Sequence, residues 1–145
     1  MKIQRMDHVG VVVNDLAAAK AFFLDLGLEI LGEGAVDGEW VDRVIGLDNV
    51  KVEFAMLGTP GDGANFELIQ FVEPIPIEAG LQLPANALGI RHIALVVDDI
   101  EAAVARVNAM GSAPLGEIQN FEGVFKLCYV RGPEGIILEL AEQLS

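Results

Sequence analysis

The feature that most constrains the fold is an internal duplication. When the 145-residue chain is shifted by 84 positions, residues 7–33 align with residues 91–117 without a gap and share 11 identities in 27 positions. A second similarity pairs Glu67 and Leu68 with Glu139 and Leu140 at a shift of 72, so the first copy carries about 12 extra residues before Glu67. We expect this insertion to form a loop or an added turn.

Each copy is predicted to contain one strand, one helix and three further strands. A β-branched run begins each copy, and a helical pattern follows it, preceded by Asn14 or Asp15 in one copy and Asp98 or Asp99 in the other. A glycine, Gly27 or Gly111, suits the left-handed position after each helix. The expected strands lie near 8–13, 28–33, 50–57 and 65–71, and near 92–97, 114–119, 124–131 and 136–141.

These elements predict an α+β fold built from two βαβββ modules, 1–73 and 88–145. Residues 74–87 contain three of the six prolines and little periodicity, so they are interpreted as a linker inside one structural domain. A module of this size cannot cover its own sheet. We therefore expect the modules to pair into a concave mixed sheet with the helices outside, and a concave sheet implies a pocket.

Composition excludes several classes of protein. Hydrophobic residues make up 52% of the chain, which opposes disorder, and a net charge of −13 opposes binding to nucleic acid. We expect no membrane association, because apolar runs are far shorter than the roughly 18 residues of a spanning helix. The start of the chain lacks the pattern of a secretory signal, so we expect a cytoplasmic protein. The single cysteine, Cys128, lies in an apolar run typical of a buried, inert thiol.

The candidate chemistry lies in two histidines and two glutamates that the duplication relates. His8 and His92 are the only histidines and occupy the same position in the two copies, and the last strand of each copy carries Glu67 or Glu139. Two imidazoles and two carboxylates suit one divalent ion, with Ni²⁺, Zn²⁺, Co²⁺, Mn²⁺ and Fe²⁺ all possible. Each histidine is followed two positions later by Gly or Ala, which leaves space above the same face of the strand.

Three segments, 7–16, 89–100 and 129–140, resemble the vicinal oxygen chelate superfamily, and the resemblance extends over nearly the whole chain. That superfamily includes glyoxalase I, methylmalonyl-CoA epimerase, extradiol dioxygenases, and fosfomycin and bleomycin resistance proteins. The resemblance implies that His8, Glu67, His92 and Glu139 occupy the four metal-ligand positions. A glutamate at the second position is closest to the glyoxalase I pattern.

The resemblance leaves three functions open. The first is a metal-dependent glyoxalase-like lyase or isomerase that removes a proton beside a carbonyl of a small substrate, with Glu67 or Glu139 as the base. The second is an epimerase like methylmalonyl-CoA epimerase, which returns the proton to the same carbon. The third is a small-molecule binding or drug-resistance protein that encloses a hydrophobic ligand. For all three we expect a homodimer, with the site formed within one chain or across the dimer.

Overall fold

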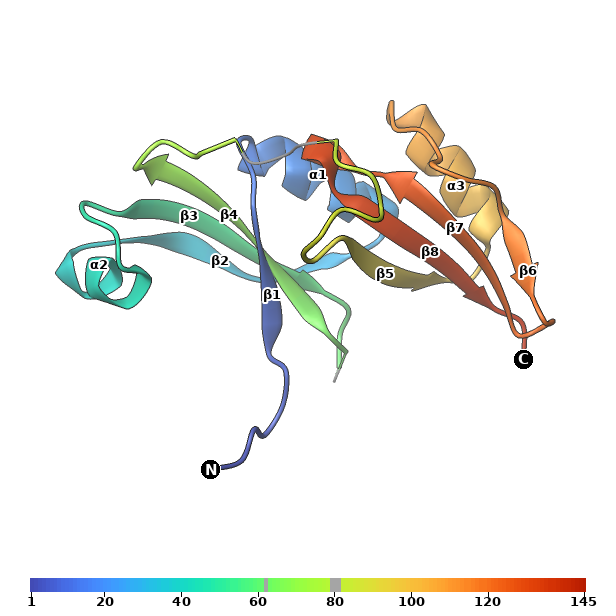
Figure 1. Ribbon diagram of the computed structural model, residues 1–145, viewed down its shortest axis with the longest axis horizontal. Coiled ribbons are helices and arrows are strands. Elements are labelled where there is room, and N and C mark those ends of the chain that lie inside the picture. The colour runs from blue at the N-terminus through green and yellow to red at the C-terminus, as the bar shows by residue number, and fades with distance from the viewer. Residues whose placement is uncertain (62, 79–81) are drawn as a thin grey trace. The chain divides into compact units, whose positions relative to one another are not determined.

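The computed structural model describes residues 1–61, 63–78 and 82–145, and it divides into two compact units, Met1–Glu78 and Ala79–Ser145. Each unit has its own four-stranded mixed sheet (Figure 1). Part of the expected linker, residues 79–81, lies outside the described residues. None of the helices in the described ranges is long and apolar enough to cross a membrane.

The first unit contains two helices and one sheet. Along the chain, its elements are β1 (His8–Val12), α1 (Leu16–Leu26), β2 (Glu29–Asp37), α2 (Glu39–Ile45), β3 (Lys51–Gly58) and β4 (Asn65–Glu73). The strand order is β1-β4-β3-β2. Strand β1 runs parallel to β4, whereas the other neighbours are antiparallel, so the first and last strands of the unit lie side by side.

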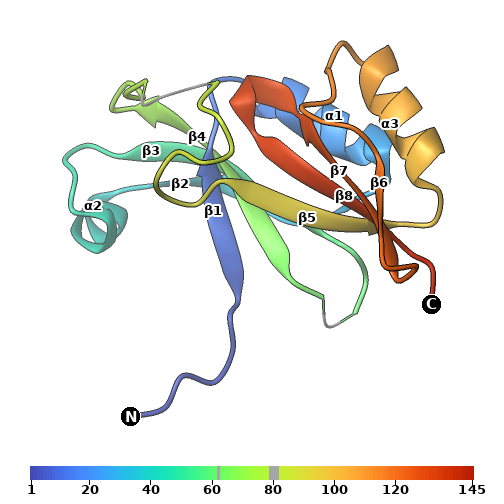
Figure 2. The same cartoon turned by 45° about the vertical axis from the view of Figure 1, so that its right-hand side comes forward.

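The second unit repeats this topology. Its elements are β5 (His92–Val97), α3 (Ile100–Ala109), β6 (Gln119–Phe121), β7 (Phe125–Arg131), a 3-10 turn (Pro133–Gly135) and β8 (Ile137–Gln143). The order is β5-β8-β7-β6, with β5 parallel to β8 (Figure 2). Both units share a βαβββ order of main elements, to which the first unit adds α2, and each has a mixed sheet, which confirms the predicted α+β fold class.

Both main helices begin in the same way, as the duplication predicts. The carboxylate of Asp15 accepts a hydrogen bond from the backbone N–H of Ala18, and Asp99 accepts one from Ala102, each at 2.9 Å. These side chains satisfy backbone donors that the first helical turn leaves unpaired. Of the alternatives that the sequence leaves open, Asp15 and Asp99 are therefore the capping residues.

A side chain from the last strand satisfies a further donor at each helix start. The amide of Gln70 in β4 accepts a hydrogen bond from the N–H of Leu16 at 2.8 Å. The carboxylate of Glu142 in β8 accepts one from the N–H of Ile100 at 2.9 Å. Gln70 and Glu142 are related by the same shift of 72 residues that relates Glu67 to Glu139. This contact fixes the start of each helix against the strand that carries the candidate glutamate.

Each sheet is covered by a helix on one face. In the first unit Phe23 of α1 is fully buried, and its ring packs edge-on against Phe66 of β4 with centroids 4.9 Å apart. In the second unit Ile100 and Val107 of α3 are fully buried, as are Leu138 and Leu140 of β8. Because side chains alternate along a strand, the neighbours of these core residues point to the opposite face, where the candidate site residues lie.

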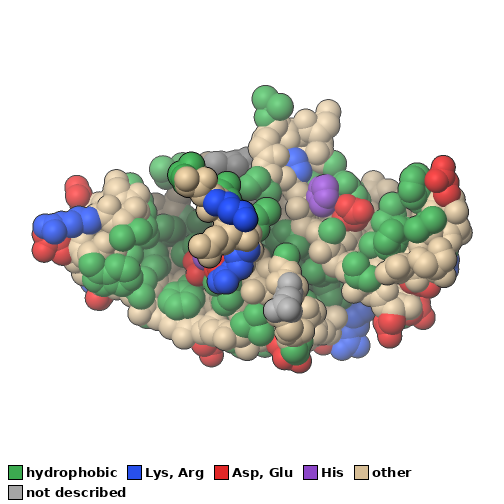
Figure 3. Space-filling view, turned by 90° about the horizontal axis from the view of Figure 1, so that it is seen from below, with side chains coloured by type: hydrophobic (Ala, Val, Ile, Leu, Met, Phe, Trp, Pro, Cys, Tyr) green, Lys and Arg blue, Asp and Glu red, His purple; other side chains and the backbone are tan. Residues whose placement is uncertain are grey.

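The insertion in the first copy forms helix α2 rather than only a loop or turn. Its one buried residue, Val41, packs with Val50 and Val52 in a small hydrophobic cluster, which gives the short helix its stability. Strand β2 is also longer than expected and extends to Asp37. Hydrophobic side chains gather over α2 at the left end of Figure 3, where Trp40 and Val44 are exposed.

The prediction of a strand at 114–119 was wrong in its position. Only Pro114 forms a bridge, to Val130, and the regular strand β6 begins at Gln119. A bend at Leu115 and Gly116 interrupts the pairing with β7. Proline lacks a backbone donor and glycine lacks a side chain to pack, so this segment is a poor continuous strand.

Candidate functional site

The four predicted ligands lie on the sheet faces opposite the covering helices. In the first unit the register places Gly10 of β1 and Met56 of β3 directly opposite Glu67. In the second unit Ala94 of β5 and Tyr129 of β7 lie directly opposite Glu139. His8 stands two residues before Gly10, and His92 stands two residues before Ala94. Each histidine therefore lies on the same face of its sheet as the glutamate of that unit.

The first unit brings His8 and Glu67 together. The His8 Nε2 atom lies 4.0 Å from Glu67 Oε2, and the two side chains are 36% and 22% exposed. On the other side of the ring, His8 Nδ1 lies 2.9 Å from Asp7 Oδ2. Arg5 donates a hydrogen bond to the second oxygen of Asp7 at 2.8 Å. Two hydrogen bonds hold the pKa of Asp7 below its ordinary value. The bond with His8 has the larger effect, and the bond from Arg5 has the next largest.

The second unit brings His92 and Glu139 together. The His92 Nε2 atom lies 3.1 Å from Glu139 Oε2, with the side chains 38% and 21% exposed. The Tyr129 hydroxyl lies 3.4 Å from His92 Nδ1, and the two ring centroids are 5.1 Å apart. Both pairs thus expose an Nε2 atom and a carboxylate on the face away from the helix.

These pairs fit the ligand chemistry of a divalent ion. Two ligand atoms bound at right angles, each about 2.1 Å from an ion, lie about 3.0 Å apart. The 3.1 Å pair formed by His92 and Glu139 matches this spacing, and the 4.0 Å pair formed by His8 and Glu67 corresponds to a wider angle. In each pair Nδ1 already has a partner, as is usual for metal-binding histidines. Each unit therefore offers one nitrogen and one oxygen ligand.

Sequence reasoning did not identify Asp7 or Tyr129 as partners of the histidines. Asp7 could have been found as the acidic neighbour of His8, because a carboxylate commonly supports a metal-binding imidazole. Tyr129 begins the segment 129–140, on which the resemblance to the superfamily rests, but no sequence pattern links it to His92. Its position became informative once the register placed it opposite Glu139.

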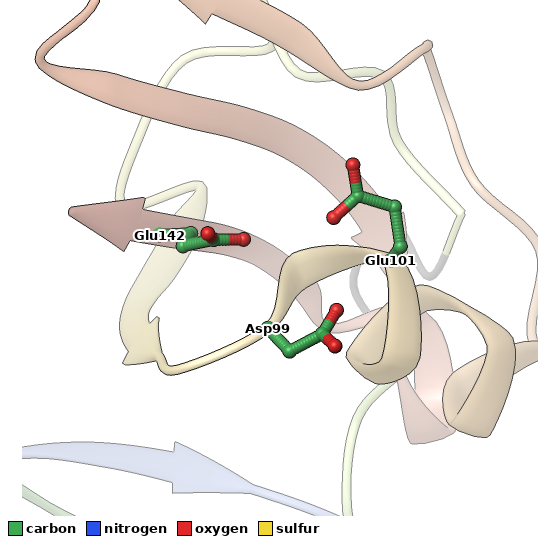
Figure 4. A group of neighbouring side chains, drawn as sticks. All are labelled: Asp99, Glu101 and Glu142. Atoms are coloured by element: carbon green, nitrogen blue, oxygen red, sulfur yellow. The ribbon is translucent and has the colours of Figure 1, made fainter. Parts of the chain in front are cut away.

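A different group of three carboxylates lies around the start of α3 (Figure 4). Asp99, Glu101 and Glu142 each offer an oxygen within 4.8 Å of the others. All three have protein partners, because Asp99 and Glu142 accept backbone N–H groups of α3 and Glu101 pairs with Lys126 at 2.9 Å. The bond from Lys126 lowers the pKa of Glu101, and the same contact raises the pKa of Lys126. The group is therefore explained by helix capping and an ion pair.

A cavity of about 610 Å³ lies beside α2, away from the sheet positions of His8 and Glu67. Asp37 and Asp42 line it together with Lys51 and Glu73, and neither His8 nor Glu67 does. Asp42 uses its two carboxylate oxygens to accept hydrogen bonds from the N–H groups of Asn49 and Val50, at 3.0 and 2.7 Å. These contacts close the turn between α2 and β3, so Asp42 has a structural role.

Known proteins share both the sequence and the fold of this chain. Residues 7–130 match the model of the glyoxalase/bleomycin resistance protein/dioxygenase superfamily. A glyoxalase family protein from Bacillus cereus has a similar structure with a TM-score of 0.94, at 41% identity over 100% of this chain and 97% of that one. The uncharacterized protein YwbC of Bacillus subtilis is 29% identical over 97% of this chain and 98% of its own.

Glyoxalase I from Zea mays shares the fold more distantly. Its structure, of a mutant with one glutamate replaced by glutamine, matches with a TM-score of 0.67 and 18% identity, over 97% of this chain and 48% of the maize chain. The family match covers residues 7–130, which is most of the sequence. The chain belongs to the glyoxalase/bleomycin resistance protein/dioxygenase superfamily.

Proposed function

We propose that the protein is a metal-dependent, glyoxalase-like lyase or isomerase that acts on a small carbonyl compound. The observation that carries the proposal is the repeated pairing of a histidine Nε2 atom with a glutamate carboxylate, at 4.0 Å in one unit and 3.1 Å in the other. In this proposal His8, Glu67, His92 and Glu139 together bind one divalent ion, either within one chain or across a homodimer.

The bound ion would polarise the substrate carbonyl and stabilise the negative charge that develops on its oxygen when the neighbouring carbon loses a proton. The protein supplies the base. An oxygen of Glu67 or Glu139 takes the proton from that carbon, because both carboxylates are partly exposed on their sheet faces and within reach of a substrate there. The glutamate then returns the proton to the former carbonyl carbon. The hydroxyl on the carbon that lost the proton becomes the new carbonyl, and its proton passes to the oxygen of the former carbonyl, which completes an isomerisation. Return to the original carbon would instead give epimerisation.

The surroundings of the two glutamates favour a small substrate without a large anionic group. Gly10 and Met56 are uncharged, as are Ala94 and Tyr129, and these four residues lie directly opposite the glutamates. Recognition of an acyl-CoA or a phosphonate calls for clustered positive charge, which would also have to overcome the net charge of −13. We therefore favour the lyase or isomerase reaction over an acyl-CoA epimerase.

Metal content is the first test of the proposal. Protein purified without a metal-binding tag is analysed by mass spectrometry for metal per chain, alongside the His92→Ala variant. One ion per four-ligand site in the wild type and loss of that ion in the variant are the expected results. A metal-free protein that gains neither stability nor bound metal when Ni²⁺, Zn²⁺ or Mn²⁺ is added would overturn the proposal and favour a small-molecule binding protein.

Turnover of α-ketoaldehyde adducts and of epimerisable thioesters then tests the reaction. Replacement by Gln of the glutamate that acts as the base, Glu67 or Glu139, should reduce kcat by at least about 10²-fold, the usual contribution of a general base. Two carboxylates on the same strands serve as matched controls. Glu73→Gln in β4 and Glu142→Gln in β8 change carboxylates that pair with Lys51 and with the α3 backbone. Full turnover in both Glu67→Gln and Glu139→Gln would contradict the mechanism.

A further inference from the structure

We propose that Asn65 selects substrates that carry a hydroxyl group on the carbon that loses its proton. The observation that carries this inference is a buried hydrogen-bond acceptor without a donor. The side-chain oxygen Oδ1 of Asn65 is buried and has no hydrogen-bond partner within the described part of the chain. Buried polar atoms in native proteins are nearly always paired, so an unpaired one calls for an explanation.

Asn65 lies on the site face of the first unit. It begins β4 two residues before Glu67, and side chains two positions apart on a strand point to the same face. The parallel register places Asn65 directly opposite His8. The residue between Asn65 and Glu67 is Phe66, which is buried on the other face against α1. Asn65 is therefore a neighbour of both His8 and Glu67.

The space that the Asn65 amide occupies exists because residue 58 is a glycine. A Cβ atom on Gly58 would lie only 2.2 Å from Asn65 Oδ1, so no side chain fits there while the amide keeps this position. The Cδ1 atom of Leu31 lies 3.0 Å from the same point. Neither Gly58 nor Leu31 has a side-chain donor, so these neighbours bury the oxygen without pairing it.

The fold does not require an amide at this position. The shift of 72 residues relates Asn65 to Ile137, which lies directly opposite His92 in the second unit. Ile137 is only 2% exposed. An apolar side chain at this place in the module is thus compatible with the same strand pairing. The amide of the first copy is an addition to the common plan, which favours a role in binding.

A substrate hydroxyl supplies the missing donor. This inference rests on the proposed function, in which the carbon that loses its proton carries a hydroxyl. The backbone positions of Asn65 and Glu67 are about 7 Å apart along β4. A hydroxyl that donates to Oδ1 at about 2.8 Å, and a glutamate oxygen about 3 Å from the attached carbon, span about the same length with the C–O bond between them. One substrate can therefore contact both side chains.

The oxygen reaches the substrate when the carboxamide rotates. Asn65 Oδ1 lies beside Gly58, and no donor from a described residue holds it there. The last torsion of an asparagine side chain is broad, so this rotation requires little energy. Leu31 is 45% exposed, which leaves its side chain free to move aside. The amide can thus turn from Gly58 toward the open face of the sheet.

This arrangement identifies the substrate class as α-hydroxycarbonyl compounds. A site built to hydrogen-bond a substrate hydroxyl rejects an analogue that lacks it, because the polar group of the site is left unpaired. The thioester substrate of a methylmalonyl-CoA epimerase has no hydroxyl on the carbon that loses its proton. Asn65 therefore favours the isomerisation over the epimerisation.

Urea unfolding tests the unpaired acceptor in the free protein. Asn65→Leu replaces the amide by an apolar group of similar shape, so the transition midpoint should rise. Asn120→Leu is the matched control, because Asn120 Oδ1 accepts a hydrogen bond from the N–H of Gly123 at 2.8 Å, and its midpoint should fall. A midpoint that fell in Asn65→Leu as well would mean that a donor such as water already satisfies this oxygen, and would overturn the inference.

Hydrogen–deuterium exchange of a substrate tests the selectivity. The protein as purified is incubated in D₂O with hydroxyacetone or with its methyl ether, methoxyacetone, and NMR measures deuterium uptake at the carbon that carries the ether or hydroxyl oxygen. The ratio of the two rates is compared between wild type and Asn65→Leu, so that the intrinsic reactivities of the compounds cancel. We expect the preference for hydroxyacetone to fall by about 10–100-fold in the variant. An equal ratio in the two proteins would overturn the inference.

An NMR titration of the wild type distinguishes failure of this inference from failure of the proposed function. The ¹H–¹⁵N signals of the Asn65 side-chain amide are followed as each compound is added. Shifts with hydroxyacetone but not with methoxyacetone support the selection of a hydroxyl. If such shifts occur and neither compound takes up deuterium, the proposed reaction is contradicted and the role of Asn65 stands. If deuterium is taken up and the amide signals do not shift, the reaction stands and the role of Asn65 is overturned.

Discussion

Replacement of Glu142 separates a structural role of this carboxylate from a metal-binding one. Glu142 accepts a hydrogen bond from the N–H of Ile100, a fully buried residue at the start of α3. Gln70 performs the same task for Leu16 in the first unit without a charge. The duplication therefore predicts that Glu142→Gln keeps the contact, whereas Glu142→Ala removes it.

The expected magnitudes follow from these contacts. A hydrogen bond to a charged group contributes about 1.5–3 kcal/mol, so Glu142→Ala should lower the free energy of unfolding by about 2 kcal/mol. Glu142→Gln loses only the attraction between an anion and the helix start, about 0.3–1 kcal/mol. It also relieves repulsion from Asp99 and Glu101, whose carboxylates lie close by. The net change for Glu142→Gln should stay within about 0.5 kcal/mol.

Urea unfolding followed by circular dichroism measures both effects as shifts of the transition midpoint. Gln70→Ala is the matched control in the first unit and should cost about 1 kcal/mol, the usual value for a neutral hydrogen bond. The reasoning would be refuted if Glu142→Gln were as destabilising as Glu142→Ala. In that case the charge itself, and not the hydrogen bond to Ile100, would be what the fold requires at this position.

Three further predictions concern the core, the cysteine and the surface charges. Phe23→Ala should lower the free energy of unfolding by about 3–5 kcal/mol in urea titrations, because it opens a cavity beside Phe66; a loss below about 1 kcal/mol would contradict this packing. Burial raises the pKa of the Cys128 thiol, so at pH 8 a thiol reagent should modify it much faster in urea than in the native protein; equal rates would contradict its burial. The pKa of Glu101 lies below its ordinary value of 4.5, so its pairing with Lys126 stabilises the fold above that pH and the effect is lost as the pH falls through the lowered pKa. The stability difference between wild type and Glu101→Gln should therefore shrink below pH 4.5, and a difference that grows there would contradict the pairing.

The duplication explains why the sequence predicts the fold well. Because the two copies match without a gap over the first strand and helix, each supports the assignment of the other, and the caps Asp15 and Asp99 follow from the same positions. The prediction is weaker where the copies diverge. Helix α2 depends on packing of Val41 against distant Val50 and Val52, which no local pattern reveals.

The candidate site was only half predictable for a similar reason. Symmetry identifies His8, His92 and the two glutamates, because they are equivalent in the two copies. It hides Asp7 and Tyr129, because these are the positions at which the copies differ. A cross-strand neighbour such as Tyr129 becomes visible only when the register of β7 against β8 is known. Whether the four predicted ligands share one ion stays a prediction for the metal analysis.

The parallel pairing of the first and last strands has a consequence for folding. In each unit the histidine lies on the first strand and the glutamate on the last, so their contact closes the longest loop in that unit. Such contacts carry the largest entropic cost and generally form after local hairpins. A nascent or truncated unit without its final strand would hold a histidine with no glutamate beside it. Ligand binding by either pair would thus report that its unit has folded completely.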